Sequence, residues 1–590
     1  MKKLLLGNEA VALGAYEAGV KVASAYPGTP STEITESISK YDGIYAEWSP
    51  NEKVALEVAL GASIAGARAM VCMKHVGLNV AADPLFTSSY TGINGGLVIV
   101  VADDPGMHSS QNEQDSRFYG RAAHIPVLEP SNSQEAKDFT KLAFEISEKF
   151  DTPVMLRMTT RVSHSRSLVE PGERLDIRLR DYVKDVGKYV MMPAMARGRR
   201  TALVEREKKL QEYSEKADIN KIEYNDRSIG IIAAGGAYNY AKEAAPGASF
   251  LKLGMVYPLP QELIKSFTEN VERLFVVEEL ETFIEDYIKT LGVEVFGKEY
   301  FPKIGELSYE IVAQGLKAAG IKSEILNFAF EDRVEVKASR IPPRPPALCP
   351  GCPHRGVYHV LKKLNLTVTG DIGCYTLGAL PPLSSMDTCI CMGASIGNAH
   401  GMEKALGKDA SWKTVAVIGD STFIHSGITG LIDVVYNNGT TTVIILDNST
   451  TGMTGHQEHP ATGFNIKGEP AYKLNLEKLC EAVGVRRVRV EDPFDLEKFE
   501  KAVREEISSQ EPSVIIARRP CALLKRVQVK NPPYGVNTDT CIGCGLCIEL
   551  GCPAMENRDF ISIDETMCTG CGLCAAVCPT KSITRGDMRG

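Results

Sequence analysis

Eight of the 16 cysteines lie within the last 50 residues, in two closely spaced runs. Each run ends in Cys-Pro, and the members are Cys541, Cys544, Cys547 and Cys552, then Cys568, Cys571, Cys574 and Cys578. Two-residue gaps let three thiolates converge on an iron–sulfur cube, and in two-cluster ferredoxins the fourth cysteine ligates the other cluster. We therefore predict two [4Fe–4S] clusters, one on Cys541, Cys544, Cys547 and Cys578, the other on Cys568, Cys571, Cys574 and Cys552.

A zinc module is the alternative interpretation, because Cys-x2-Cys pairs also hold zinc. Zinc needs only four ligands and rarely uses three equally spaced cysteines twice, so the pattern favours clusters. The gap before Cys552 has four residues where three is usual, which could alter the geometry of that half. Since so short a tail cannot bury a large core, the clusters should also stabilise its fold.

A second group of polar residues follows two apolar runs, at residues 414–418 and 442–446. Gly419, Asp420 and Ser421 end the first run, and Asn448 follows the second closely. A strand-end glycine lets backbone N–H groups approach a phosphate, and Asp and Asn oxygens suit Mg²⁺. A strand-end Asp is also a common helix cap, so Gly-Asp alone is a weak signal.

The spacing from Gly419-Asp420 to Asn448 resembles the thiamine diphosphate motif. The resemblance implies that Asp420, Asn448 and the Thr450 carbonyl oxygen bind Mg²⁺, with Gly419 and Ser421 beside the diphosphate. Ser421 stands where that family commonly has glycine.

Several stretches resemble the 2-oxoacid:ferredoxin oxidoreductases over almost the whole chain. They are YPGTPSTE at residues 26–33, the triplet at 51–53, and residues 75–79, 103–113 and 349–355, which look most like the alpha subunits of the indolepyruvate branch. The resemblance implies that Glu52 hydrogen-bonds the aminopyrimidine of the cofactor and that Thr29 lines the substrate carboxylate site. Glu57, one helical turn on, competes for the role of Glu52, and a carboxylate at a helix start is also favoured by the helix dipole.

Four further cysteines match, in order, the ligands of a third cluster in that family: Cys349, Cys352, Cys374 and Cys521. A cluster beside the thiamine would accept single electrons from the oxidised intermediate. Buried structural thiols are the alternative, since free cysteine is commonly buried. Cys389 and Cys391 are alternative ligands, whereas Cys72 and Cys480 are expected in the core.

Histidines in loops near these motifs have no firm assignment. His425, His456 and His459 lie near the expected thiamine loops, and His75 and His108 lie in family-like stretches. Each either contacts substrate or is an ordinary polar or hydrogen-bonded side chain.

The resemblance implies oxidative decarboxylation of an aryl-pyruvate, with indolepyruvate as substrate and phenylpyruvate and hydroxyphenylpyruvate also accepted. Coenzyme A would take the acyl group and an external ferredoxin the electrons. The resemblance also implies a small beta subunit in an α2β2 assembly. Low-potential clusters suggest an anaerobic source. Two other functions remain open: an electron-transfer subunit whose thiamine half is only a scaffold, and a non-oxidative thiamine enzyme.

Apolar runs alternating with helical stretches predict an α/β fold of parallel sheets. The family resemblance implies that this fold is of the transketolase and pyruvate:ferredoxin oxidoreductase type. We expect buried strands at residues 97–102, 154–158, 228–234, 250–253, 274–277, 414–418, 442–446 and 513–517, and a helix at 55–69. The predicted domains are 1–175 for the pyrimidine, a charged connector at 176–225, a transketolase C-terminal-like domain at 226–335, 336–525 for the diphosphate and Mg²⁺, and an α+β ferredoxin domain at 530–590. Prolines at 341–346 and 532–533 mark linkers.

Bulk composition narrows the class of protein further. The 590 residues are 44% hydrophobic and 24% charged, as in globular proteins. The net charge of −8 argues against a nucleic-acid or anionic-membrane partner. The apolar start is too short for a signal peptide and predicts a first strand, and no apolar run could cross a bilayer, so we expect a cytoplasmic protein.

Overall fold

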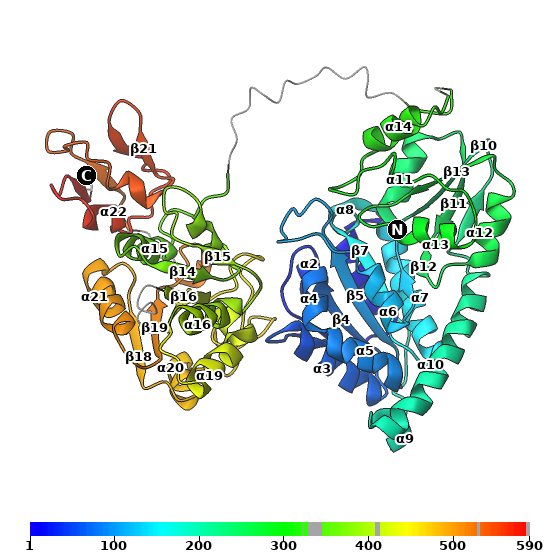
Figure 1. The fold of residues 1–590 in the computed structure, drawn as a ribbon, viewed down its shortest axis with the longest axis horizontal. Coiled ribbons are helices and arrows are strands. Elements are labelled where there is room, and N and C mark those ends of the chain that lie inside the picture. Colours follow the sequence, from blue (N-terminus) through cyan, green and yellow to red (C-terminus); the bar gives the residue numbers. More distant parts are fainter. Residues whose placement is uncertain (323, 328–344, 408–413, 528–530, 586–590) are drawn as a thin grey trace. The chain divides into compact units, whose positions relative to one another are not determined.

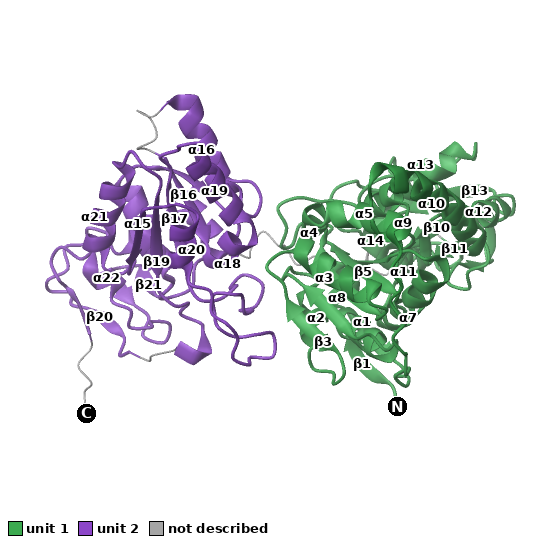
Figure 2. Ribbon diagram, turned by 90° about the horizontal axis from the view of Figure 1, so that it is seen from below, with its two compact units in different colours: residues 1–337 green, residues 338–590 purple. Residues whose placement is uncertain are grey.

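The computed structural model describes residues 1–322, 324–327, 345–407, 414–527 and 531–585. The chain divides into two compact units, residues 1–337 and 338–590 (Figure 2). Of the proline run predicted as a linker, residues 341–344 lie outside the described residues. Within the described residues, no helix combines the length and apolar character that a bilayer span requires.

The first unit is built on a seven-stranded sheet in the order β12-β6-β7-β5-β4-β2-β3 (Figure 1). All neighbouring strands are parallel except β12, which pairs antiparallel with β6. The central strands are buried throughout because helices cover both faces, as their apolar sequences require. The bounds are β2 Val22–Ala25, β3 Tyr45–Trp48, β4 Ala69–Lys74, β5 Leu97–Asp103, β6 Val127–Leu128, β7 Val154–Thr159 and β12 Met255–Tyr257.

Eight helices follow these strands in the N-terminal part of the chain. They are α1 Gly7–Glu17, α2 Thr32–Ile38, α3 Glu52–Ile64, α4 His75–Val80, α5 Ala82–Thr91, α6 Arg117–Ala123, α7 Ser133–Phe150 and α8 Thr160–His164. The predicted helix at 55–69 was wrong at both ends. Asn51 caps the helix, which therefore begins three residues earlier, at Glu52, and Gly66 turns the chain at φ +96° before β4. The first strand, β1 (Lys3–Leu6), pairs with β8 (Arg166–Val169) outside the main sheet.

A second sheet of four strands completes the first unit. Its order is β13-β10-β11-β9, and only β9 is antiparallel to its neighbour. Ile232, Leu251 and Phe267 of this layer share one hydrophobic core with Ile99 and Met155 of the first sheet. The bounds are β9 Lys221–Glu223, β10 Asp226–Ala234, β11 Ala248–Leu253, β13 Arg273–Val277, α11 Gly235–Ala244, α12 Gln261–Thr268, α13 Phe283–Thr290 and α14 Tyr309–Ala318.

The charged stretch predicted as a solvated helix and connector is packed on one face. It contains α9 (Val186–Tyr189) and the long α10 (Pro193–Ser214), which contacts α5 and α7. Leu203, Arg206 and Leu210 are buried there. Arg206 donates 2.7 Å to the Asp151 carbonyl oxygen, so even a charged residue of this helix is part of the packed interior.

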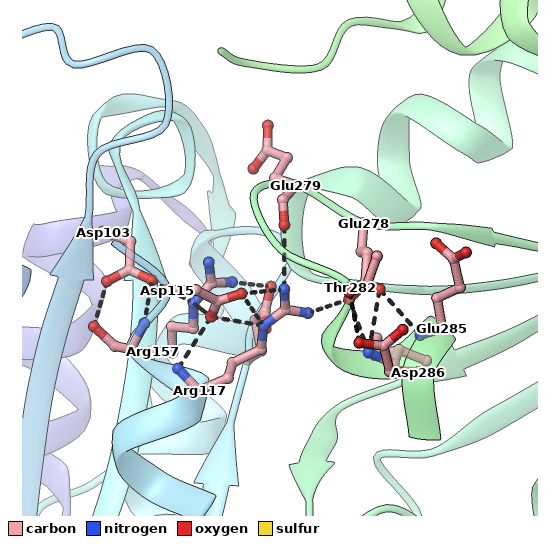
Figure 3. Close-up of polar contacts among 12 residues, drawn as sticks. Asp103, Asp115, Arg117, Arg157, Glu278, Glu279, Thr282, Glu285 and Asp286 are labelled. Carbon is pink, nitrogen blue, oxygen red and sulfur yellow. Dashed lines mark hydrogen bonds and ion pairs between the residues drawn. The ribbon is translucent and has the colours of Figure 1, made fainter. Parts of the chain in front are cut away.

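Two buried arginines form a network with carboxylates around the first sheet, and Arg117 extends this network to the second layer (Figure 3). Arg117 donates 2.7 Å from Nη1 to Glu278 and 2.9 Å from Nε to Asp115. Arg157 donates 2.7 Å to Asp103 and 2.7 Å to Glu129. Both guanidinium groups are therefore paired with carboxylates of the same chain, and these ion pairs offset the free energy that burial of the charges requires.

The second unit carries a six-stranded sheet in the order β15-β14-β16-β17-β19-β18, parallel throughout (Figure 1). The strands are β14 Thr367–Gly370, β15 Thr388–Cys389, β16 Thr414–Gly419, β17 Thr442–Asp447, β18 Arg487–Glu491 and β19 Ser513–Arg518. The helices are α15 His354–Lys363, the 3-10 turn η2 Cys374–Ala379, α16 Ala394–Leu406, α18 Asp420–Thr422, the π-turn η3 Phe423–Gly427, α19 Ile428–Tyr436, α20 Leu476–Ala482, α21 Leu496–Ile507 and the 3-10 turn η4 Lys525–Val527.

The cysteine-rich tail forms a small α+β module at the end of this unit. Its two antiparallel pairs are β20 Tyr534–Val536 with β23 Ile583–Arg585, and β21 Met555–Asn557 with β22 Ile561–Ile563; its short helices are η5 Ile548–Leu550 and α22 Leu573–Ala576. Cys547, Ile561 and Ile583 form a small buried cluster in it, as expected for so short a segment.

All eight predicted buried strands are present, each within two residues of its expected bounds. Uninterrupted apolar runs of five or six residues predict such strands well, because a parallel strand covered on both faces has no polar side to alternate with. The predicted α/β class and α+β tail are confirmed.

Candidate cofactor and cluster sites

The loop of the YPGTPSTE motif leaves the carboxyl end of β2. Tyr26 is buried, and Ser31 donates 2.8 Å back to the Gly28 carbonyl oxygen, which closes a tight turn. Thr29 is partly exposed, and its carbonyl oxygen accepts a 3.1 Å hydrogen bond from Ser109. Thr29 thus lies at the carboxyl end of a strand, the edge at which ligands bind in open α/β sheets.

Glu52 opens α3 and is only 4% exposed. Asn51 caps the helix by accepting from the Val54 N–H, 2.9 Å away, which sets the direction of the first turn. A Cβ on Gly77 would lie 2.6 Å from Glu52 Oε1, so glycine in α4 leaves room for this carboxylate. Glu57 is exposed and pairs with Lys53, so burial favours Glu52 over its competitor.

Lys74 was missed by the sequence analysis, which had no signal for a lysine at the end of an apolar strand. Its side chain is buried, and its stem lies against Gly28. Burial lowers the pKa of Lys74 to about 8, although the charges of Asp104 and Glu52 oppose that shift. Its Nζ donates 3.0 Å to the Ser109 carbonyl oxygen.

Asp104 organises the loop that carries Ser109. Its Oδ2 accepts from the Ser109 N–H at 2.9 Å and from the Ser110 hydroxyl at 2.7 Å, and Oδ1 accepts from Thr160 at 2.6 Å. Lys74, Ser109 and Thr29 therefore form one chain of contacts. The stretch at 103–113 holds the motif loop in place, a role that only the folded structure shows.

The proposed Mg²⁺ ligands of the second unit lie on two adjacent loops. Asp420 begins α18, where its Oδ1 accepts 2.8 Å from the Ser421 N–H and its Oδ2 accepts 2.9 Å from the Ser449 N–H. The pKa of Asp447 is raised by burial and by the charge of Asp420 beside it. Two neighbouring buried carboxylates with Asn448 are a donor set that a hard divalent cation fits.

Asn448 and Thr450 follow on the second loop, where Asn448 Oδ1 accepts 3.1 Å from the Thr450 N–H. Both are buried. Ser421, in place of the usual glycine, accepts a 3.0 Å hydrogen bond from Thr451, so its hydroxyl joins the two loops.

The histidines divide into two groups. His459 Nε2 lies 3.3 Å from Asp420 Oδ2, and His425 and His456 lie on neighbouring segments of the same unit. His75 is buried with Nε2 3.2 Å from Asn112, whereas His108 is exposed and pairs with Glu306. His354, which the sequence analysis did not single out, has Nε2 3.5 Å from Asn448 Nδ2, and burial lowers its pKa to about 4.

The four cysteines of the predicted third cluster lie next to the Asn448 loop. The Cys521 N–H donates 2.9 Å to the Asn448 carbonyl oxygen, and a Cβ on Gly452 would lie 3.4 Å from Cys374 Sγ. Burial raises the pKa of Cys374 to about 11, and the charges of Cys521 and Cys349 add to the shift. The pKa of Cys352 is raised to about 12 by burial, again with contributions from Cys349 and Cys521.

Cys389 and Cys391, the alternative ligands, adjoin a different group. Cys389 Sγ donates 3.5 Å to the Asp371 carbonyl oxygen, and Cys391 is exposed. Cys72 and Cys480 are buried in the hydrophobic core, as expected.

The tail brings each predicted cluster set together around a cavity of its own. One cavity is lined by Cys541, Cys544, Cys547 and Cys578, the other by Cys552, Cys568, Cys571 and Cys574. The four-residue gap before Cys552 forms the turn η5 and ends at Gly551 with φ +65°, which absorbs the extra residue. Among the described residues, no three cysteine, histidine or carboxylate side chains converge closely enough for a single metal ion.

Known protein families match three parts of the chain. Residues 13–228 match "Pyruvate flavodoxin/ferredoxin oxidoreductase, thiamine diP-bdg", and residues 371–517 match "Thiamine pyrophosphate enzyme, C-terminal TPP binding domain". Residues 561–584 match "4Fe-4S binding domain". The predicted thiamine and iron–sulfur domains are thereby confirmed at the level of domain type.

Curated relatives match the chain along almost its whole length. "Indolepyruvate oxidoreductase subunit IorA" of Archaeoglobus fulgidus is 44% identical over 99% of this chain and 97% of its own length. The proteins of the same name from Pyrococcus abyssi and Methanothermobacter marburgensis are 43% and 42% identical, each over 98% of this chain and 96% of their own length.

Proposed function

This chain belongs to the family of indolepyruvate oxidoreductase subunits IorA, and we propose that it catalyses coenzyme A-dependent oxidative decarboxylation of aryl-pyruvates, with ferredoxin as electron acceptor. Indolepyruvate is the proposed main substrate, with phenylpyruvate and hydroxyphenylpyruvate also accepted. The products would be the aryl-acetyl-CoA and CO₂. A small beta subunit, in an α2β2 assembly, is the proposed partner.

The observation that carries this proposal is the continuity of the cysteine groups in the second unit. The Asn448 carbonyl oxygen accepts from the Cys521 N–H, so the third cysteine group adjoins the proposed Mg²⁺ loop. Pro350 and Gly351, between Cys349 and Cys352, also line the cavity of Cys552, Cys568, Cys571 and Cys574. We propose that three clusters occupy these cysteine sets and carry electrons one at a time from the thiamine site to ferredoxin.

Thiamine diphosphate, when bound, supplies the carbanion chemistry that decarboxylation of a 2-oxoacid requires. Asp420, Asn448 and the Thr450 carbonyl oxygen would hold its Mg²⁺, and Gly419 and Ser421 would face the diphosphate. Glu52 would hold the proton at the aminopyrimidine ring nitrogen, for which a buried carboxylate with room around it is suited. Thr29 would contact the substrate carboxylate, positioned through Ser109 and Lys74.

Substrate preference is tested with the protein purified anaerobically together with its small partner subunit. Coenzyme A-dependent viologen reduction would be measured with indolepyruvate, phenylpyruvate, pyruvate and 2-oxoglutarate in parallel. We expect the two aryl substrates to give at least tenfold higher kcat/KM. A preference for pyruvate would overturn the aryl assignment.

The role of Glu52 has a matched control on the same helix. Glu52→Gln should abolish turnover and leave the iron and sulfide content unchanged, because Glu52 belongs to the first unit and every proposed cluster ligand belongs to the second. Glu57→Gln removes an equal charge one turn on, at an exposed site, and should leave turnover unchanged. Full activity of Glu52→Gln would remove Glu52 from this role.

An electron-transfer subunit with a non-catalytic thiamine scaffold is the second candidate, favoured by the cysteine-lined cavities considered alone. Bound thiamine diphosphate together with 2-oxoacid-dependent reduction of the clusters would exclude it. Aldehyde release without ferredoxin reduction would instead indicate a non-oxidative enzyme.

A further inference from the structure

Arg355 is a buried cation in the second unit, and among the described residues it donates hydrogen bonds only to carbonyl oxygens. It lies in the first turn of α15 and is 2% exposed. Its Nη1 donates 2.7 Å to the Leu550 carbonyl oxygen, and Nη2 donates to Leu348 and, at 3.4 Å, to Cys349. Its Nε has no hydrogen-bond partner, and no ion pair joins it to a carboxylate of the described residues.

The position of Arg355 is between two cysteine groups. On one side it lines the cavity formed by Cys552, Cys568, Cys571 and Cys574. On the other side its partners Leu348 and Cys349 belong to the segment that carries the Cys349–Cys352 pair. Gly551, next to Cys552, is close as well, since a Cβ there would lie 3.4 Å from Arg355 Nη1.

A buried guanidinium without an anion is costly, because carbonyl dipoles replace only part of the hydration that it loses. The side chain of Arg355 lines the cavity that the thiols of Cys552 and Cys571 also line, and its Nη2 lies 3.4 Å from the carbonyl oxygen of Cys349. Thiolates become permanent anions when they ligate iron. A cluster bound by these cysteines would therefore supply the negative charge that balances Arg355.

We propose that the Arg355 guanidinium is the fixed counter-charge of the iron–sulfur cluster held by Cys552, Cys568, Cys571 and Cys574, and that it raises the reduction potential of that cluster. This inference rests on the proposed function, which places a cluster in that cavity. One-electron reduction adds one negative charge to the cluster, and net charge and hydrogen bonding near the sulfurs set cluster potentials. A fixed cation therefore favours the reduced form, and so favours the electron's arrival from the neighbouring cysteine group.

A purely structural role is the alternative, because Arg355 also joins Leu348 to Leu550 across the module boundary. Substitution separates the two roles. Arg355→Gln keeps a hydrogen-bond donor and removes the charge, whereas Arg355→Lys keeps the charge and removes the planar fork. The matched control is Arg558→Gln, which removes one positive charge from an exposed pair with Glu556 in the same tail.

The experiment is a redox titration of the anaerobically purified, full-length complex, followed by electron paramagnetic resonance. Arg355→Gln should shift the midpoint potential of one cluster to a more negative value and leave the others in place. A tenfold loss of the preference for the reduced form corresponds to about 59 mV for a one-electron couple. Arg355→Lys and Arg558→Gln should stay within a small fraction of that shift.

The other possible results bear either on the role of Arg355 or on the proposed function. An Arg355→Gln protein with full iron content and an unchanged potential would overturn the inference. If Arg355→Gln fails to retain clusters, Arg355→Lys decides: full iron content and an unchanged potential support the charge role, and loss of clusters or an equal shift overturns it. An unmodified chain that contains no iron and sulfide would instead defeat the proposed function itself.

Discussion

The two units bury arginines in opposite ways. In the first unit, Arg117 is enclosed by Asp115 and Glu278; burial opposes its charge, but the two carboxylates outweigh burial and raise its pKa (Figure 3). In the second unit, burial lowers the pKa of Arg355, and the groups that oppose that shift are cysteines, which carry a negative charge only when deprotonated. In the first network, carboxylates of the same chain supply the counter-charge of the arginine. In the second unit, the counter-charge of Arg355 would come from the group that the cysteines bind. This difference distinguishes a structural ion network from a cofactor site.

Removal of the Arg117 cation from the first network should have the largest effect. Arg117→Met leaves Asp115 and Glu278 buried without their shared partner, and removal of one member of a buried ion network costs about 3–5 kcal/mol. We expect a large fall in the calorimetric unfolding temperature of the first unit. An unchanged unfolding temperature would show that the network is not needed for stability.

The pH dependence of Glu279 sharpens the same comparison, since this carboxylate borders the network without an arginine of its own. Burial raises its pKa from 4.5 to about 7, so the unfolded chain releases its proton at lower pH than the folded chain. This group therefore lowers the free energy of unfolding as pH rises from 4.5 through 7, by roughly 3 kcal/mol at pH 8.

Glu279→Gln should accordingly raise the unfolding temperature of the first unit at pH 8 and change it little at pH 5. Glutamine keeps an oxygen to accept from the Leu307 N–H, which is 3.1 Å from Glu279 Oε1. Unfolding followed at both pH values measures the effect. A stabilisation that is equal at pH 5 and pH 8 would contradict a raised pKa for this carboxylate.

Removal of the clusters tests the other side of the comparison. Arg355→Gln should destabilise the cluster-loaded second unit more than the same unit stripped of iron by a chelator. The expected difference is roughly 1.5–3 kcal/mol, the range for hydrogen bonds to charged groups. Equal destabilisation in the two forms would mean that Arg355 acts only through its carbonyl partners.

Substitution of an exposed arginine should change the free energy of unfolding least. Arg161 pairs with Glu306 at 2.6 Å, but its side chain is 57% exposed. Arg161→Gln should therefore change the free energy of unfolding by less than about 1 kcal/mol. A larger loss would show that the exposed pair is coupled to the neighbouring buried charges.

Local patterns predicted the strands and the cysteine sets because each depends on few residues. Five consecutive apolar residues suffice for a buried parallel strand, and a Cys-x2-Cys-x2-Cys loop directs its thiolates to one point. The predicted bounds of the helix at 55–69 were wrong because its cap, Asn51, lies outside the small-residue run, and because Gly66, inside that run, ends the helix early. The charged connector failed in part because the polar residues of α10 concealed a narrow buried face.

The sequence by itself determined the family, the α/β class and the two thiamine-type domains, since all of these are recorded in short patterns; the assignment of cysteines to clusters stays a prediction. Only the tertiary structure decided that Glu52 rather than Glu57 is buried, that Lys74 lies against the Thr29 loop, and that Arg355 pairs with no carboxylate of the described residues. These facts depend on which side chains distant parts of the chain bring together. Burial and pairing of a charge are properties of that environment, and no local pattern encodes them.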